Sequence, residues 1–292
     1  MEVITENQPQ ELRGKQVAAA IMEDNLCRAE KLTAAGHQPT LALFRLGERP
    51  DDVFYEGSIL RHCERAGIKV LHTVLPEDCP DAEFAARLIA AANDNGIDAM
   101  FFFSPLPRHL DEPKLRELIP AAKDVDCLSK ASAASVFCGD DEGFAPCTPA
   151  AVMEMLKYYQ VPLAGKKAVV LGRSLVVGKP LAMLLLNENA TVTICHSRTE
   201  NLPAVCREAD VLLAAVGRAR LVKEDWVSAG QVIIDVGVNA DPENPGKMCG
   251  DVDYANVLPK VAAATPVPGG VGLVTTAILC RHIIEAAEKA AK

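Results

Sequence analysis

The stretch Val169–Pro180 contains the residues of this sequence that are best suited to bind a phosphate group. In it an apolar run ends at Gly172-Arg173-Ser174, and Gly178 follows where a helical pattern starts. A strand, a glycine turn and a helix start together let backbone N–H groups approach a pyrophosphate. The two glycines lie six positions apart and do not match the general G-x-G-x-x-G spacing. We therefore expect a dinucleotide-binding turn, with a purely structural turn as the alternative.

A second polar group, Cys195–Thr199, follows the next apolar run. NAD-binding folds usually place an aspartate or glutamate at this point to accept from the ribose 2′-hydroxyl, but this group contains no acid. Ser197, Arg198 and the earlier Arg173 can donate to a 2′-phosphate, whose oxygens match the planar guanidinium. These residues favour NADP over NAD, unless the arginines are ordinary surface residues. His196 is expected to lie beside the adenine rather than to act as a base.

Apolar strands alternate with helical patterns along the chain, which predicts a parallel α/β architecture. The first half predicts a βαβαβ series, with helices over residues 15–35, 54–66 and 81–93, strands over 41–46, 69–75 and 98–103, and a turn at 47–52. The second half predicts strands over 167–171, 191–195, 211–215 and 232–236, and helices over 150–159, from 178, and over 275–291. We expect the last helix to pack back on the first lobe.

The composition is that of an ordinary globular protein that is long enough for two domains. Of its 292 residues, 49% are hydrophobic and 24% are charged, which excludes a disordered chain. The 30 basic and 39 acidic residues give a net charge of −9, so we expect no nucleic-acid partner and no membrane binding. No run of about 18 apolar residues is present, and the polar N-terminus lacks the order of a secretory signal. A cytoplasmic protein is therefore expected.

The ten cysteines form neither a metal-binding nor a disulfide pattern. Neighbouring cysteines are at least nine positions apart, whereas zinc sites usually need C-x2–4-C pairs and disulfide frameworks belong to short secreted chains. We expect most of these thiols to act as small apolar residues in a reducing cytoplasm, and we predict no metal site.

Several longer strings follow one another in a specific order. They are GRSLVVGKP, ATVTICHSRT, VIIDVGVN, GDVD and TPVPGGVG in the second half, and PTLALFRLG, CERAGI, SPLP, KDVD and PCTP in the first. Over roughly residues 12–290 they resemble the methylenetetrahydrofolate dehydrogenase/cyclohydrolase family. The resemblance implies two lobes with a folate cleft between them: a folate-side domain at 1–147 plus 276–292, and a Rossmann-like NADP-binding domain at 148–275. It also implies a homodimer that acts in one-carbon metabolism and purine biosynthesis.

The same resemblance implies which residues form the site. Tyr55 and Asp126 would be the catalytic residues, because the tyrosine offers the folate rings an aromatic surface and the carboxylate accepts from the donor-rich edge of the pterin. Phe103 and the loop Pro268-Gly269-Gly270 would complete the substrate site. Contacts to NADP would come from Gly172, Arg173, Ser174, Gly178, His196, Ser197, Arg198, Val216, Gly217, Val238 and Gly272.

Five positions on the presumed folate side depart from the family pattern. The family's lysine, four residues after the tyrosine, is Ile59 here, and its glutamine, two residues before Pro-Leu-Pro, is Phe103. Cys127 stands in place of a glycine, Asp52 in place of a serine and Leu273 in place of a proline. The nucleotide side is nearly complete by comparison.

The missing lysine predicts a dehydrogenase whose cyclohydrolase activity is weak or absent. Hydride transfer from 5,10-methylenetetrahydrofolate to the nicotinamide requires mainly positioning, whereas hydrolysis of the methenyl product requires general acid–base groups. Ile59 has no titratable proton, and Phe103 has no hydrogen-bonding amide. A separate cyclohydrolase is then expected in the same organism. The alternatives are a bifunctional enzyme, a paralogous NADP-dependent oxidoreductase with another substrate, and a non-catalytic NADP-binding dimer.

Overall fold

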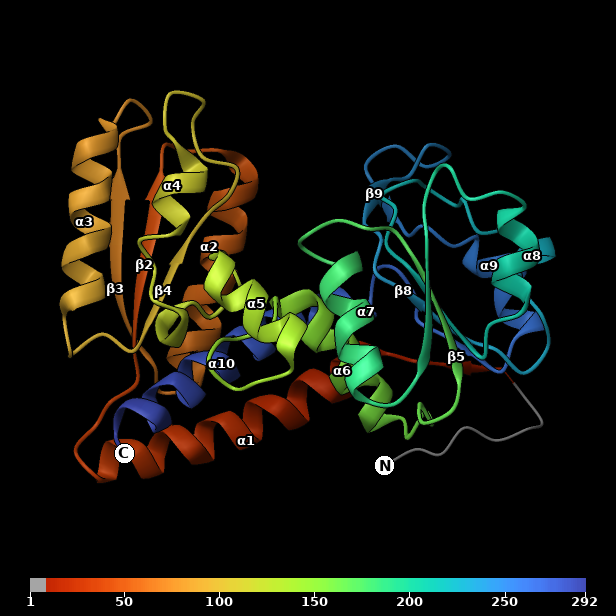
Figure 1. Ribbon diagram of the computed structural model, residues 1–292, viewed down its shortest axis with the longest axis horizontal. Helices are drawn as coiled ribbons and strands as arrows, with labels where there is room; N and C mark the ends of the chain where they lie inside the picture. The colour runs from red at the N-terminus through yellow and green to blue at the C-terminus, as the bar shows by residue number, and fades with distance from the viewer. Residues whose placement is uncertain (1–8) are drawn as a thin grey trace. The chain divides into compact units, whose positions relative to one another are not determined.

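The computed structural model describes residues 9–292, and its contacts divide the chain into two compact units (Figure 1). Residues 9–18 and Thr148–Thr275 belong to the first, which we call the six-stranded unit. Ala19–Cys147 and Thr276–Lys292 form the second, which we call the three-stranded unit. None of the described helices combines the length and the hydrophobicity that a membrane span requires.

The three-stranded unit is built on a parallel sheet in the order β3-β2-β4. Its strands are β2 Thr40–Leu46, β3 Lys69–Leu75 and β4 Ala99–Phe102. The helices that contribute to it are α1 Gly14–Ala34, α2 Pro50–Arg65, α3 Asp81–Asn93, α4 Glu112–Arg116, α5 Lys130–Cys138 and α10 Thr275–Ala290. Every residue of β2 is buried, as expected for a central strand that is covered on both faces.

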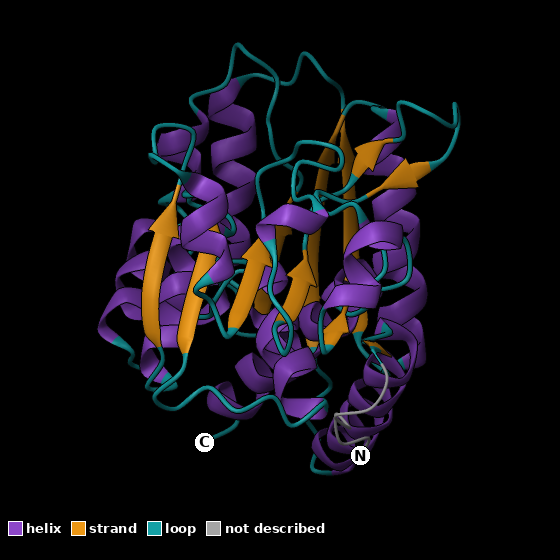
Figure 2. Ribbon diagram, turned by 90° about the vertical axis from the view of Figure 1, so that its right-hand side faces the viewer, coloured by secondary structure: helices purple, strands orange, loops and turns teal. Residues whose placement is uncertain are grey.

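The six-stranded unit contains a parallel sheet in the order β1-β11-β8-β7-β5-β6. Its strands are β1 Gln10–Glu11, β5 Lys167–Leu171, β6 Thr191–Cys195, β7 Val211–Ala214, β8 Val232–Asp235 and β11 Ala263–Ala264, and an antiparallel pair is formed by β9 Asn239–Ala240 and β10 Met248–Cys249. Its helices are α6 Cys147–Tyr158, α7 Gly178–Asn187, α8 Leu202–Arg207 and α9 Tyr254–Val257. Figure 2 shows its longer strands pointing the same way. The chain passes from β5 to β6 on one side and to β7 on the other, so the sheet has a Rossmann-like switch point between β5 and β7.

The structure confirms the two-domain parallel α/β fold and corrects several predicted boundaries. The turn expected at 47–52 is wrong in its second half, because α2 begins at Pro50. A proline at the first helical position, followed by Asp51 and Asp52 in the first turn, favours a helix start at this point. The strand predicted at 98–103 is shorter and covers Ala99–Phe102.

The sequence predicts residues 1–147 as part of the folate-side domain, but residues 9–18 belong to the six-stranded unit; residues 1–8 lie outside the described part. Gln10 pairs with Ala263 in a parallel ladder of two residues, and the Gly14 N–H donates to the carbonyl of Gly269 at 2.8 Å. A two-residue strand has no alternating pattern, and its partner lies far along the sequence. Local periodicity therefore could not assign this segment.

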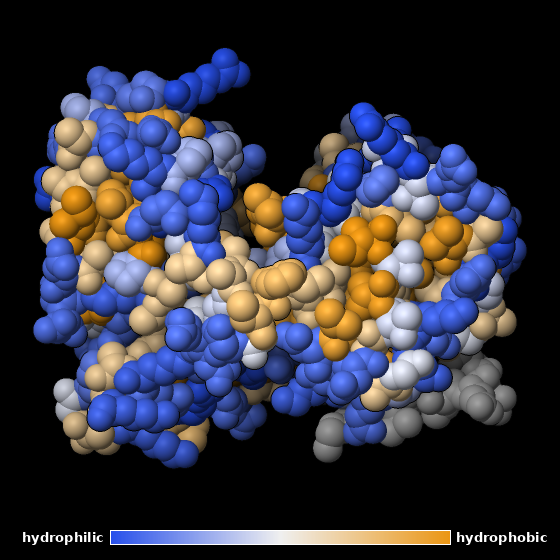
Figure 3. All heavy atoms as spheres, viewed as in Figure 1, coloured by the Kyte–Doolittle hydropathy of each residue, from blue (hydrophilic) through white to orange (hydrophobic). Residues whose placement is uncertain are grey.

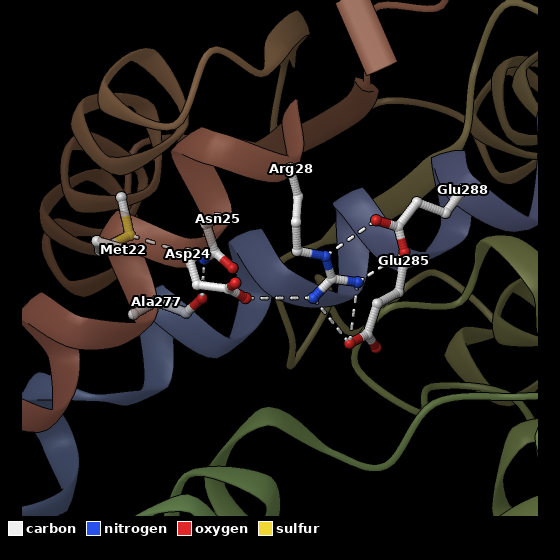
Figure 4. Close-up of polar contacts among 7 residues, drawn as sticks. All are labelled: Met22, Asp24, Asn25, Arg28, Ala277, Glu285 and Glu288. Atoms are coloured by element: carbon white, nitrogen blue, oxygen red, sulfur yellow. Dashed lines mark hydrogen bonds and ion pairs between the residues drawn. The ribbon is translucent and has the colours of Figure 1, made fainter. Parts of the chain in front are cut away.

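The last helix, α10, packs against α1 within the three-stranded unit, as the sequence predicts (Figure 4). The Arg28 guanidinium binds the carboxylates of Glu288 at 2.7 Å and Glu285 at 3.4 Å. One helical turn earlier, the buried Asn25 amide donates to the carbonyl of Ala277 at 2.9 Å. These contacts fix the C-terminal helix to a segment near the other end of the chain.

Candidate active site

Tyr55 lies on α2 and contacts two phenylalanines on and just after β4. The rings of Phe101 and Phe103 meet it edge to face, at centroid distances of 6.4 and 6.1 Å. Burial, and next the neighbouring Cys147 thiol, hold the pKa of Tyr55 well above its usual value, although Thr276 lies close enough to its hydroxyl to lower this pKa slightly. Tyr55 therefore stays a neutral phenol, which can orient a ligand but does not act as a base.

The residue one helical turn after Tyr55 is Ile59, and its side chain is completely buried. Residues four apart lie on the same face of a helix, so Ile59 occupies the position from which a side chain could support the tyrosine. Phe103 is also buried and adds a ring to the same corner. Neither side chain can donate, accept or transfer a proton.

Sequence reasoning did not assign two members of this corner, Phe101 and Thr276. The run Phe101-Phe102-Phe103 contained a usable signal, because alternate residues of a strand point to the same face. That rule pairs Phe101 with Phe103, whose ring centroids lie 5.3 Å apart. Thr276 has no local signal, since it reaches Tyr55 from the far end of the sequence.

A cavity of about 820 Å³ lies at the carboxyl ends of the strands in the three-stranded unit. In the order β3-β2-β4 the switch point falls between β2 and β4, and open α/β sheets bind ligands at such points. Phe103 and Asp52 line the cavity together with Arg49, whose guanidinium lies 3.4 Å from Asp52 and 2.6 Å from the carbonyl of Pro105. Two of the departures from the family pattern therefore alter the wall of this cavity.

Asp126 lies between α4 and α5 in the chain, and its Oδ1 accepts the N–H of Cys147, the first residue of α6, at 2.8 Å. Burial raises the pKa of Asp126 to about 6; repulsion from Asp124 adds to the rise, and the hydrogen bonds from Cys147 reduce it. Asp124 is itself fixed, because its carboxylate accepts the N–H groups of Leu128 and Ser129 at 2.8 Å each. Hydrogen bonds to Asp124 and to Asp126 thus hold the turn that contains both residues. The carboxyl of Asp126 changes its charge not far below neutral pH.

Cys127, next to Asp126, has a left-handed backbone with φ = +56°, which costs an L-residue about 1–2 kcal/mol. We expect Cys127→Gly to raise the free energy of unfolding by about 0.5–1 kcal/mol, after the larger backbone entropy of glycine is subtracted. Urea denaturation measures this difference. The control Cys27→Gly, in the middle of α1, should lower the same free energy by roughly a few tenths of a kcal/mol. A loss of stability in Cys127→Gly would show that packing of the thiol outweighs the backbone strain.

The glycine turn of the six-stranded unit joins β5 to α7 at the switch point. Gly172 has φ = +118°, and a Cβ there would lie 2.2 Å from the carbonyl oxygen of Ala215. A Cβ at Gly178 would lie 2.3 Å from the carbonyl oxygen of Gly172. The Ser174 hydroxyl accepts the Val177 N–H at 3.0 Å, and α7 begins at Gly178. Only glycine fits at both positions, and the turn delivers a helix N-terminus to the edge of the sheet where nucleotides bind.

The predicted 2′-phosphate donors lie at the ends of two adjacent strands. Leu171 pairs with Cys195 in the ladder of β5 and β6, so the segments that follow these two residues are neighbours. Arg173, Ser197 and Arg198 are all exposed in these segments. His196 is already engaged, because its Nδ1 accepts the Arg198 N–H at 3.2 Å. The two segments thus present basic and hydroxyl groups side by side.

The remaining predicted residues of the six-stranded unit follow other strands. Val216 and Gly217 come after β7 and Val238 after β8, at the same edge as the glycine turn. The loop Pro268-Gly269-Gly270 follows β11, and it contacts Gly14 closely enough that a Cβ at Gly14 would lie 2.1 Å from the carbonyl oxygen of Gly270. Gly272 differs, because a Cβ there would meet nothing within 4 Å. Its lack of a side chain is not required by the protein's own packing.

Two models of protein families match the chain. Residues 12–126 match the catalytic domain described as tetrahydrofolate dehydrogenase/cyclohydrolase, and residues 146–291 match the NAD(P)-binding domain of the same description. The matches together span both units.

Individual relatives also match the chain over nearly their whole length. Bifunctional protein FolD of Carboxydothermus hydrogenoformans is 58% identical over 95% of this chain and 96% of its own. Bifunctional protein FolD 1 of Desulfitobacterium hafniense is 48% identical over 94% and 97%. The solved structure of the bifunctional enzyme FolD from Campylobacter jejuni has a TM-score of 0.92 at 36% identity and 96% and 99% coverage. The FolD structure from Trypanosoma brucei, complexed with NADP cofactor and inhibitor, has a TM-score of 0.90 at 30% identity and 98% and 99% coverage.

Proposed function

Because this chain belongs to the tetrahydrofolate dehydrogenase/cyclohydrolase family, we propose that it is an NADP-dependent dehydrogenase of 5,10-methylenetetrahydrofolate. The product is 5,10-methenyltetrahydrofolate. The observation that carries the proposal is the match of both family models, with Tyr55, Asp126 and the glycine turn inside the matched ranges.

The residues around the glycine turn fit a phosphorylated dinucleotide. Gly172 and Gly178 allow the backbone of the turn to pack closely at the start of α7, where the Ser174 hydroxyl accepts the Val177 N–H, and Arg173 and Arg198 are exposed in the segments after β5 and β6. When bound, the nicotinamide accepts the hydride from the substrate carbon. The backbone would hold the pyrophosphate, and the arginines would hold the 2′-phosphate through paired N–H donors.

On the folate side the dehydrogenase reaction requires that the substrate is held in position, and it requires no base from the protein. Tyr55, fixed by its aromatic neighbours, would present its ring to the folate, and Asp126 would accept from the pterin N–H groups. The substrate's own nitrogen lone pair drives departure of the hydride. A neutral phenol and a carboxylate therefore suffice for the dehydrogenase reaction.

For the second reaction of the family, the comparisons favour the bifunctional alternative, because the most similar relatives reported above are named bifunctional. They also give no support to a separate cyclohydrolase as a partner. One feature of this chain argues the other way. Ile59 and Phe103 fill the corner beside Tyr55 with groups that cannot transfer protons. We therefore keep weak cyclohydrolase activity as the finer part of the proposal.

Two assays on the same purified protein test the proposal. The first follows NADPH formation from 5,10-methylenetetrahydrofolate, and the second compares hydrolysis of the methenyl compound with its rate in buffer alone. NADPH formation with near-buffer hydrolysis supports both parts, and hydrolysis well above buffer establishes the bifunctional alternative. Binding of NADP without NADPH formation would favour either the paralogous oxidoreductase or the non-catalytic dimer.

Arg173→Ala is expected to raise the KM for NADP by about tenfold or more while leaving the KM for NAD within about twofold. The reason is that only NADP carries the 2′-phosphate that the guanidinium would bind. Steady-state kinetics with each cofactor measures the two constants. Arg87→Ala, an exposed arginine on α3 of the three-stranded unit, is the matched control and should change neither. Equal increases for both cofactors would remove Arg173 from the 2′-phosphate site.

The homodimer that the resemblance implies stays a prediction, and one surface of the six-stranded unit supports it. Leu175 and Val176 in the glycine turn and Leu186 on α7 are 74%, 59% and 53% exposed. Figure 3 shows apolar atoms gathered on the six-stranded unit in this region. A second copy of the chain would remove such side chains from water.

A further inference from the structure

The loop after β7 is held by a buried carboxylate, Asp251, that has no assigned role. Its Oδ2 accepts the N–H groups of Val216 and Gly217 at 2.6 and 3.1 Å. Its Oδ1 accepts the Arg218 N–H at 2.8 Å and the Asn239 side-chain amide at 2.9 Å. Three successive backbone N–H groups around one anion form an anion-binding nest. Here the protein fills the nest with its own side chain, which is fully buried.

A second buried carboxylate, Asp235 at the end of β8, holds the backbone that carries Asp251. Its Oδ1 accepts the N–H groups of Gly237 and Asp251 at 2.9 and 3.0 Å, and its Oδ2 accepts that of Val252 at 2.9 Å. A Cβ at Gly237 would lie 2.2 Å from the Asp251 carboxyl carbon, and one at Gly250 would lie 1.9 Å from Asp235 Oδ2. The two carboxylates thus interlock with two glycines that admit no side chain.

The loop held in this way is part of the nucleotide edge of the sheet. Ala215 donates its N–H to the carbonyl of Leu171 at 2.9 Å, and its own carbonyl lies against Gly172. Val216 and Gly217, which the Asp251 carboxylate binds, are among the predicted cofactor contacts. A shift of this loop would therefore change both its own surface and the fit of the glycine turn.

We propose that Asp251, supported by Asp235, is a positioning residue that holds the loop Ala215–Arg218 in its NADP-binding conformation. The inference rests on the proposed function and adds a residue to it. The four hydrogen bonds that reach the carboxylate all come from N–H donors, so an acceptor-only group is required at this position. Asp251 does not touch the cofactor itself; it acts through the backbone of the loop.

The test is the affinity of the purified full-length protein for NADPH, measured by fluorescence titration, together with both Michaelis constants. Asp251→Asn is expected to raise the Kd for NADPH by about tenfold, because its amide NH₂ faces a backbone N–H. The KM for the folate should stay within about twofold. The control Asp253→Asn makes the same change two residues along the chain, where the carboxylate meets Lys223 and Asn256, and should leave NADPH binding unchanged.

Chemical rescue separates positioning from a general loss of stability. In Asp251→Ala the nest is open, and added formate is expected to recover part of the NADPH affinity at concentrations that leave the wild type unchanged. Unchanged NADPH affinity in Asp251→Asn, or an equal rise in both Michaelis constants without rescue, would overturn the proposal. If the Asp251 variants do not fold, Asn239→Ala removes one donor only and should raise the Kd about threefold, and no change would overturn the proposal. A wild type that binds no NADPH would instead overturn the proposed function.

Discussion

Replacing Ile59 with lysine and Phe103 with glutamine in one variant is expected to raise the rate of methenyltetrahydrofolate hydrolysis by about 10²–10⁴-fold. The lysine would place an amine one helical turn from Tyr55, and the glutamine would give that amine a hydrogen-bonding partner. Ile59 is completely buried, so desolvation would lower the pKa of the introduced amine and leave part of it neutral as a base. Loss of the methenyl chromophore, followed with time, measures the rate.

The matched control for this gain is Ile59→Met with Phe103→Leu, which changes both volumes without adding a proton carrier. It should hydrolyse the methenyl compound no faster than the wild type. A lysine–glutamine variant that folds and still hydrolyses at the control rate would show that this corner does not determine the second reaction. A wild type as fast as that variant would show that other groups already perform it.

Asp126→Ala is expected to lower kcat/KM for methylenetetrahydrofolate by about 100-fold or more, because the pterin donors would lose a half-buried charged acceptor. In the wild type the same constant should rise with pH through about 6, since the pKa of Asp126 is raised to about 6 and only the ionised form accepts from two donors. Below that pH the protonated carboxyl carries an O–H donor, which would face the N–H donors of the pterin. Binding of the folate substrate therefore weakens about tenfold per pH unit. Kinetics with saturating NADP over pH 5–8 measures both effects.

Asp126→Asn distinguishes the charge from the shape of this side chain. Its activity should be low at every pH, and the rise near pH 6 should be absent, because an amide does not titrate. Asp140→Ala removes an exposed carboxylate from the same unit and is expected to change neither the activity nor its pH profile. A wild-type rise that persists in Asp126→Asn would assign the titration to another group.

The strands and glycines that define the fold were readable from the sequence because their causes are local. The strand predicted at 167–171 and the helix start at Gly178 are found as predicted, since a continuous apolar run and a glycine turn act over a few residues. The two-residue strands β1 and β11 were not readable. Their pairing depends on contacts between opposite ends of the sequence, and each is too short to have a period.

Some residues of the site could likewise be predicted from the sequence, and others could not. Arg173 and Arg198 could be associated because each follows an apolar run, and neighbouring parallel strands end at the same edge of a sheet. In the sequence, Asp251 was noted only as part of the string GDVD, with no role assigned to it. Nothing local indicates that three donors from the loop after β7 and one from β9 converge on its carboxylate.

The attachment of α10 to α1 has a consequence for synthesis on the ribosome. Asn25 and Arg28 lie in the first tenth of the chain, and their partners Ala277, Glu285 and Glu288 lie at its end. Most of α10 is also buried within the three-stranded unit. The nascent βαβαβ segment therefore emerges long before the helix that completes its core. Until translation reaches that helix, the segment exposes an apolar surface that the rest of the nascent chain, or a chaperone, must shield.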